Sequence, residues 1–241
     1  MTDYSFAGFP AGTLDFFRQL EANNNREWFQ ANKHLYEEVV RRPMISLVEA
    51  INGFLASAAP HYATEPAKSI FRIYRDTRFS KDKTPYKTHS GALFIHQSLA
   101  KLASAGLYVS VSHKEVEVAG GIYMPGNEQL LIVRNSLVDR HLEFESLARS
   151  LQKLMGDLQG EQLARSPKGF SPDHPAADLL RRKQLYWYVT LKPELALSKK
   201  LYGEVTRRFS AMLPALDFLN QPLLDHEKKA RRQAELQRTR W

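Results

Sequence analysis

The chain has 241 residues, of which 43% are hydrophobic and 25% are charged, and such values are ordinary for a globular protein with a substantial core. It contains no cysteine, which excludes disulfide bonds, thiolate metal sites and a cysteine nucleophile and is in keeping with a reducing compartment. The formal net charge of +8 at pH 7 leaves anionic small molecules and nucleic acid open as partners.

The start of the chain, MTDYSFAGFPAGTLDFF, lacks the basic segment and the long apolar run of a secretory signal. No later run approaches the roughly 18 apolar residues that a membrane-spanning helix needs. We therefore expect a cytoplasmic protein that does not enter a membrane.

Helices are expected over the N-terminal residues 13–57. Thr13 is a candidate N-cap for the first helix, and the three asparagines Asn23, Asn24 and Asn25 predict a tight corner after it. Pro43 is suited to the first turn of a third helix. The three expected helices span residues 14–22, 26–41 and 43–57.

Strand patterns follow in residues 69–122. The β-branched and aromatic residues of 69–75 predict a strand with Phe71 and Ile73 on one face, although the three-residue spacing of Arg72, Arg75 and Arg78 would also align them along a helix. The alternation on either side of His113-Lys114 predicts a β-hairpin, and Gly120-Gly121 predicts a bulge, a bend or a close backbone approach. The expected strands span residues 69–75, 91–96, 108–112, 115–122 and, later in the chain, 186–191.

Helices are expected again after the hairpin. Asn127 is a candidate N-cap, and Asp173 is a candidate cap for a helix entered through Pro175. A turn-rich polar loop, ARSPKGFSPDHP, occupies residues 164–175. The expected helical stretches span residues 127–158, within which two helices are expected, then 175–183 and 194–235.

These elements together predict an α+β fold. We expect an antiparallel or mixed sheet of about four to five strands, packed against N-terminal and C-terminal helices. No linker is long enough to divide the chain, so residues 1–241 are expected to form a single domain.

The positive charge is concentrated in residues 68–91, KSIFRIYRDTRFSKDKTPYKTHSG, where seven Lys and Arg residues accompany two Asp residues. A second basic segment, residues 225–240, has six Lys and Arg residues and three acidic ones, so the rest of the chain is neutral. Cations this close repel each other unless carboxylates, solvent or an anionic ligand compensate them. The planar fork of Arg and the point charge of Lys both bind phosphate well.

The string FRIYRDTRFSKDKTPYK resembles the signature of a family of uncharacterised bacterial and fungal proteins that is catalogued only as a domain of unknown function. The hallmark of that family, RxxRDxRFxxDKxxY, is matched here at Arg72, Arg75, Asp76, Arg78, Phe79, Asp82, Lys83 and Tyr86. The resemblance extends to GFP and NNNREWFQANK near the N-terminus, to GGIYMP and to RSPKGFSPDHP, and so covers nearly the whole chain. It implies a single-domain architecture and candidate positions, but no reaction.

Candidate site residues gather in the basic segment. Asp76 is expected to orient the neighbouring guanidiniums, because adjacent cations lower the pKa of a carboxyl group. We expect the loop of residues 78–87 to lie within reach of residues 165–168, with Trp28, Asn32 or Lys33 forming an adjacent wall. The ligand-binding candidates are Arg72, Arg75, Arg78, Lys83, Lys87, Arg165 and Lys168, and the candidates for proton transfer are Asp82, Tyr86 and His89.

No glycine-rich phosphate loop, nucleophile elbow or paired metal-binding histidines occur in the sequence, so no metal is assigned and the cofactor stays unknown. Three functions are compatible with the basic segment. The first is binding of a phosphate-bearing small molecule or nucleotide, with or without chemistry on it. The second is a non-catalytic module for nucleic acid or another polyanion, which would also use the C-terminal basic segment and the stacking faces of Tyr74, Phe79 and Tyr86. The third is a structural lattice of ion pairs. The oligomeric state does not follow from the sequence.

Overall fold

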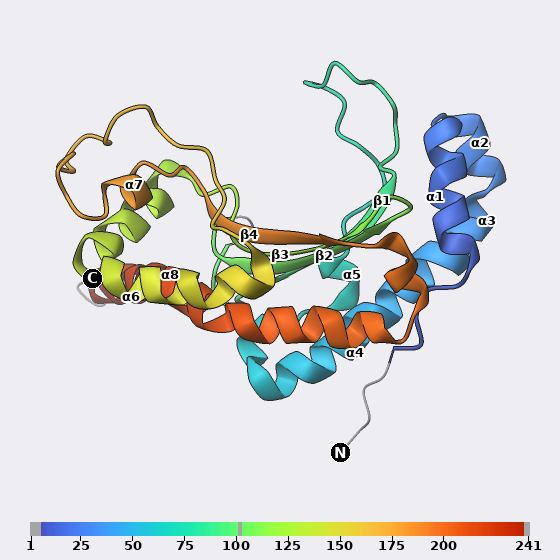
Figure 1. Ribbon diagram of the computed structural model, residues 1–241. Helices are drawn as coiled ribbons and strands as arrows, with labels where there is room; N and C mark the ends of the chain where they lie inside the picture. The colour runs from blue at the N-terminus through green and yellow to red at the C-terminus, as the bar shows by residue number, and fades with distance from the viewer. Residues whose placement is uncertain (1–5, 101–102, 239–241) are drawn as a thin grey trace. The chain divides into compact units, whose positions relative to one another are not determined.

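A computed structural model describes residues 6–100 and 103–238 of the chain. It contains a four-stranded antiparallel sheet whose strands lie in chain order, β1-β2-β3-β4 (Figure 1). Helices make up most of the other regular structure, so the predicted α+β class is confirmed. The strands are β1 (His89–Ile95), β2 (Gly106–Ser112), β3 (Val116–Ile122) and β4 (Leu185–Leu191).

The predicted hairpin is formed by β2 and β3. The N–H of Ser112 donates to the carbonyl of Glu115 at 3.0 Å, across the two-residue turn His113-Lys114. The hydroxyl of Ser112 also accepts from the N–H groups of Lys114 and Glu115, at 3.1 and 3.0 Å. Because this hydroxyl satisfies two backbone donors of the turn, the register of the hairpin is fixed locally.

The strand expected over residues 69–75 is absent, and the segment makes only isolated bridges, from Ile70 to Ala92 within β1 and from Tyr74 to Tyr86 ahead of it. The N–H of Phe71 donates to the carbonyl of Gly91 at 2.9 Å, and the N–H of Lys87 donates to the carbonyl of Ile73 at 2.8 Å. The bonded positions are thus two residues apart on one segment, at 71 and 73, and four residues apart on the other, at 87 and 91. This mismatch breaks the ladder, which the alternation of one segment alone does not reveal.

Gly121 lies where β3 and β4 approach each other closely. Its φ of +130° is one that side chains with a Cβ rarely adopt. A Cβ at this position would lie 2.3 Å from the carbonyl oxygen of Leu185. The close backbone approach predicted for Gly120-Gly121 is therefore confirmed.

The N-terminal helices differ from the expected set at two points. The second expected helix is interrupted at Asn32, and beyond that residue the helical backbone continues into the third without a gap. Residues 37–41 form a π-helical turn that joins the two. The helices are α1 (Gly12–Ala22), α2 (Arg26–Ala31), α3 (Lys33–Tyr36), the π-helical turn Glu37–Arg41 and α4 (Arg42–Ala58), followed by the short helices Pro60–Tyr62 and α5 (Pro66–Ser69).

Thr13 does not cap α1, which begins after Ala11; its hydroxyl instead donates to the carbonyl of Val39 at 2.6 Å in the buried interior. An N–H at position 43 would be the α-helical partner of that carbonyl, but Pro43 has none. The threonine therefore satisfies the acceptor that the proline leaves open, and it ties α1 to the π-helical turn.

The later helices also depart from expectation. The two helices expected within residues 127–158 form one, α6, which is kinked at Arg140 (φ −125°, ψ 24°), and its N-cap is Gly126 rather than Asn127. Asp173 caps no helix, because the helix that follows begins only at Ala177. Along residues 6–100 and 103–238, no helix is both long enough and apolar enough to cross a bilayer. These elements are α6 (Asn127–Met155), α7 (Ala177–Leu180), the 3-10 helix Pro193–Leu197 and α8 (Lys200–Arg238).

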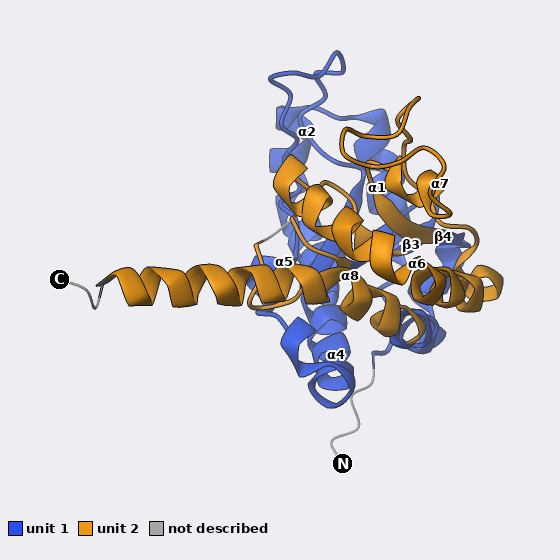
Figure 2. Cartoon of the chain, turned by 90° about the vertical axis from the view of Figure 1, so that its left-hand side faces the viewer, with its two compact units in different colours: residues 1–94, 107–118, 189–210 blue, residues 95–106, 119–188, 211–241 orange. Residues whose placement is uncertain are grey.

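The chain forms two compact units, coloured separately in Figure 2. Each unit is assembled from three separate segments, so the chain passes repeatedly from one to the other. The assignment of residues 1–241 to a single domain stays a prediction. The first unit comprises residues 1–94, 107–118 and 189–210, and the second comprises residues 95–106, 119–188 and 211–241.

Within the first unit, the strands have two different faces. Phe94 of β1 packs edge-on against Phe209 of α8 with the ring centroids 5.7 Å apart, so this face belongs to the core. Val109 of β2 and Val118 of β3 are likewise fully buried. Residues of the opposite parity along each strand point to the other face. Apart from Ser90 of β1, which has the parity of Phe94 and is buried, the polar side chains of these strands lie on that second face.

Candidate functional site

The motif loop, residues 71–87, belongs to the first unit and holds two of its arginines in ion pairs. Arg78 binds Asp76 in a bidentate fashion, with Nε to Oδ1 at 3.0 Å and Nη2 to Oδ2 at 2.8 Å. Arg75 donates through Nη1 to the carboxylate of Asp82 and to the hydroxyl of Thr84. These two guanidiniums are therefore partly compensated inside the loop.

Ion pairing favours the charged form of both aspartates of the loop. Hydrogen bonding from Arg78 lowers the pKa of Asp76 to about 2, and hydrogen bonding from Arg75 lowers the pKa of Asp82 to about 2. A carboxylate of such low proton affinity accepts a proton poorly near neutral pH. The geometry thus favours an anchoring role for Asp82, and its role in proton transfer stays a prediction.

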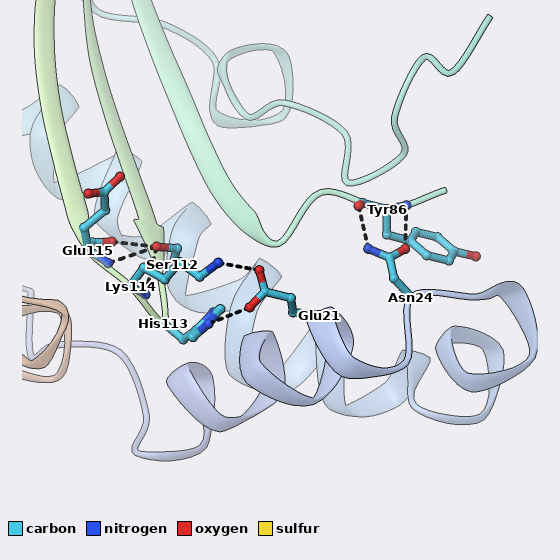
Figure 3. A network of polar contacts seen from close by, with 7 residues as sticks. All are labelled: Glu21, Asn24, Tyr86, Ser112, His113, Lys114 and Glu115. Carbon is cyan, nitrogen blue, oxygen red and sulfur yellow. Dashed lines mark hydrogen bonds and ion pairs between the residues drawn. The ribbon is translucent and has the colours of Figure 1, made fainter. Parts of the chain in front are cut away.

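Tyr86 joins the motif loop to the N-terminal helices. Its ring is only 2% exposed and stacks on Phe29, with the centroids 4.1 Å apart and the planes 21° from parallel. The side chain of Asn24 makes two hydrogen bonds to its backbone (Figure 3). Burial raises the pKa of the Tyr86 hydroxyl. Tyr86 therefore lies in the core, and proton transfer by it stays a prediction.

The same α1–α2 corner also holds the β2–β3 turn. Glu21, at the end of α1, pairs with Nε2 of His113 at 3.1 Å and with the ammonium of Lys114 at 2.5 Å (Figure 3). The hydrogen bond from Lys114 is the main reason that the pKa of Glu21 is lowered. One corner thus fixes two segments on which candidate site residues lie.

Three cationic or basic side chains of the first unit stand apart from these pairs. Within the described part of the chain, Arg72, Lys87 and His89 make no ion pair with a carboxylate. The ammonium of Lys87 lies 5.1 Å from the centroid of the Phe71 ring. Lys83, by contrast, donates to the carbonyl of Thr77 at 2.9 Å.

These three side chains influence each other electrostatically. Burial lowers the pKa of Lys87, and the charge of Arg72 lowers it further. Burial also lowers the pKa of His89, and the charge of Lys87 acts in the same direction. Arg72 also acts on the carboxylate of Asp76, whose pKa its charge helps to lower, but none of the three side chains forms a close ion pair. Repulsion that is only partly compensated is the situation that a bound anion would relieve. We call Arg72, Lys87 and His89 the cation cluster.

Polar residues that the sequence analysis missed lie on the second face of the strands. Continuing the hairpin register from Ser112 and Glu115 places Ser110 opposite Glu117. Burial raises the pKa of Tyr108 to about 12, while a hydrogen bond with Ser110 acts against this shift. The alternation that predicted the hairpin also put these residues on one face, which was a usable signal.

The other predicted residues have simpler surroundings. Arg165 and Lys168 are exposed in the polar loop of the second unit, so their approach to the motif loop stays a prediction. The side-chain amide of Asn32 donates to the carbonyl of Trp28 at 2.9 Å. Among residues 6–100 and 103–238, no cluster of three or more His, Asp or Glu side chains could hold a metal ion.

Comparison with known proteins identifies a family. The model of a conserved hypothetical protein family, DUF2461, matches residues 12–218. That range includes the motif loop, the cation cluster and all four strands. No curated protein matches the chain.

Proposed function

The chain belongs to the conserved hypothetical protein family DUF2461, and we propose that its first unit binds a phosphate-bearing small molecule or nucleotide through Arg72, Lys87 and His89. The observation that carries the proposal is that these three side chains form no close ion pair with a carboxylate within the described residues. Basic groups gathered with incomplete counter-charge favour a bound anion.

The chemistry of the cation cluster favours phosphate over a halide or a single carboxylate. Arg72 offers a planar fork of N–H donors, Lys87 offers a point charge, and His89 offers a ring N–H. A phosphate group has three oxygens that accept such donors from different directions. Arg75 and Arg78 are engaged with Asp82 and Asp76, so the proposal assigns the first contact with the ligand to Arg72, Lys87 and His89, which have no such ion pair.

The concentration of charge supports a compact ligand over a polyanion. Seven Lys and Arg residues and two Asp residues fall within residues 68–91, and the chain outside this segment and residues 225–240 is neutral. A nucleic-acid site would use several cations along a track, and its affinity would fall by orders of magnitude between about 50 and 200 mM salt. A local site with three donors has a much weaker salt dependence.

The experiment measures the melting temperature in inorganic phosphate and in a nucleoside monophosphate, against sodium chloride of equal ionic strength. At a ligand concentration of about 100 times Kd, we expect a stabilisation of about 2.7 kcal/mol. The double variant Arg72→Gln with Lys87→Gln should lose the shift. Arg149→Gln with Lys153→Gln, which removes the same charge from α6, should keep it.

Two outcomes would overturn the proposal. The first is a wild-type protein that shows no shift beyond that of chloride. The second is a shift that survives in the Arg72 and Lys87 double variant but disappears when the chain is truncated after Leu224. That result would assign anion binding to the C-terminal basic segment and favour the polyanion function.

A further inference from the structure

Glu117 is a half-buried carboxyl group for which the described residues provide no cation and no hydrogen-bond donor. It lies on β3, and the hairpin register places it opposite Ser110 of β2. Burial raises its pKa, and the nearby charge of Glu115 raises it further. Burying a carboxyl group without a partner is unfavourable. Such a group is therefore a candidate for contact with a ligand.

Tyr108 connects Glu117 to β1, the strand that carries His89. A Cβ at Gly91 of β1 would lie 2.5 Å from the Tyr108 hydroxyl, so only glycine leaves room for the ring in this position. The hydroxyl therefore lies over β1, on the face that also carries His89 by strand alternation. The charge of Glu117 acts on Tyr108 as well, which places the carboxyl near the same ring.

Phe71 completes the connection to the cation cluster. Its ring centroid lies 6.1 Å from that of Tyr108, and the ammonium of Lys87 lies 5.1 Å from the same Phe71 ring. From Lys87 through Phe71 and Tyr108 to the hairpin, one continuous set of side chains spans β1, β2 and β3. Two strand spacings of about 4.8 Å separate the backbones of β1 and β3.

We propose that Tyr108, Ser110 and Glu117 bind hydroxyl groups of the same ligand whose phosphate lies at the cation cluster, so that the ligand is a phosphate ester of a sugar or another polyol. This inference rests on the proposed phosphate site. Hydroxyls both donate and accept hydrogen bonds, and so do the side chains of Tyr108 and Ser110. A carboxylate has several acceptor positions and can receive two neighbouring hydroxyl donors.

An amine-bearing phosphate is the competing ligand, because an ammonium group would also pair with a carboxylate. The environment of Glu117 disfavours it. Burial opposes the charged form of this carboxyl, and two of the three side chains here are neutral hydroxyls. An uncharged polyol meets such a surface without the desolvation of a second ionic group.

The experiment uses isothermal titration calorimetry of the full chain with three phosphate monoesters: ribose 5-phosphate, ethyl phosphate and 2-aminoethyl phosphate. We expect ribose 5-phosphate to bind about tenfold more tightly than ethyl phosphate, since each hydrogen bond contributes modestly to affinity. Glu117→Gln should lower the affinity for ribose 5-phosphate toward that for ethyl phosphate and leave ethyl phosphate binding unchanged. Glu49→Gln, on the exposed side of α4, should alter neither affinity. Tyr108→Phe should reduce only the amount by which ribose 5-phosphate binds more tightly than ethyl phosphate.

The outcomes separate the two proposals. If ethyl phosphate binds and ribose 5-phosphate binds no better, the proposed polyol half of the site, formed by Tyr108, Ser110 and Glu117, is wrong while the phosphate site stands. Equal losses for both esters in Glu117→Gln, or tightest binding of 2-aminoethyl phosphate, would also overturn the polyol half. If no ester binds, the phosphate site itself is wrong, and the inference that rests on it falls with it.

Discussion

The side-chain amide of Asn24 makes both backbone hydrogen bonds of Tyr86. Its Nδ2 donates to the Tyr86 carbonyl at 2.9 Å, and its Oδ1 accepts from the Tyr86 N–H at 3.0 Å. Asparagine here replaces a neighbouring strand, because it offers a donor and an acceptor in the arrangement of a peptide group. The end of the motif loop is thus fixed to the helix corner although it pairs with no regular strand.

Asn24→Ala should destabilise the protein by about 1 to 3 kcal/mol, because it leaves a partly buried N–H and carbonyl without partners. The free energy of unfolding in urea is the measurement. Asn23→Ala is the matched control in the same corner. Asn23 makes only an exposed bond to the carbonyl of Gln19, so its loss should cost less than about 1 kcal/mol. Equal costs for the two variants would contradict the role assigned to Asn24.

Tyr86 provides a test that separates a core role from a catalytic one. Tyr86→Ala should lower the free energy of unfolding by about 3 to 5 kcal/mol, since a ring stacked on Phe29 is lost. Tyr86→Phe keeps the ring and should cost less than about 1.5 kcal/mol. It should also leave the melting shift in phosphate unchanged. Loss of that shift in a stably folded Tyr86→Phe variant would show that the hydroxyl serves the site.

The elements that sequence predicted well are those with local determinants. The β2–β3 hairpin follows from alternation on both sides of a two-residue turn, and β4 from a run of aromatic and β-branched residues. The failures involve distant partners. Residues 69–75 have a strand pattern, yet the segment that faces them contains two extra residues between the hydrogen bonds. Thr13 is of a residue type that often caps helices, but its hydroxyl instead donates to the carbonyl of Val39, which Pro43 leaves without an N–H partner.

The candidate site shows the same division. The concentration of charge identifies the basic segment from the sequence alone, since composition is visible without coordinates, and its role as a site stays a prediction. Which cations have carboxylate partners depends on loop geometry: Arg75 and Arg78 are paired, and Arg72 is not. Glu117 was missed although the predicted hairpin already placed it on the same face as Ser110. What the sequence does not show is that this carboxyl is half-buried and has no cation partner among the described residues.

Gly121→Ala should be strongly destabilising, and Gly156→Ala is its control. Both glycines have positive φ, +130° and +74°, so both variants are expected to lose about 1 to 3 kcal/mol through backbone strain. Only Gly121 adds a steric conflict, with the carbonyl of Leu185, whereas a Cβ at Gly156 meets nothing within 4 Å. We expect Gly121→Ala to be less stable by a further 1 to 3 kcal/mol, about the cost of overpacking. Equal midpoints in urea would contradict the close approach.

The ion pair of Arg75 with Asp82 should make stability depend on acidic pH. The pKa of Asp82 falls from 3.8 to about 2 on folding, so its contribution is present above pH 3.8 and is lost as pH falls through 2. Asp82→Asn removes the titrating group. The urea midpoint of the variant should therefore decline less than that of the wild type between about pH 5 and pH 2. Parallel declines would show that the pair contributes no such pH dependence.

His89 gives the proposed anion site a pH dependence, for which sulfate is the probe because its charge is constant over this range. Burial and the charge of Lys87 lower the pKa of His89 in the free protein, and a bound anion would raise it again by stabilising the imidazolium. The affinity for sulfate should be highest below the pKa that His89 has in the free protein. It should fall as pH rises through the higher pKa that His89 has in the complex. The affinity should fall about tenfold for each unit by which the pKa of His89 in the complex exceeds that in the free protein. Calorimetry near pH 5 and pH 8 should show this loss in the wild type and in His34→Asn, an exposed control on α3, but not in His89→Asn. A wild-type affinity that is constant over this range would exclude His89 from the site.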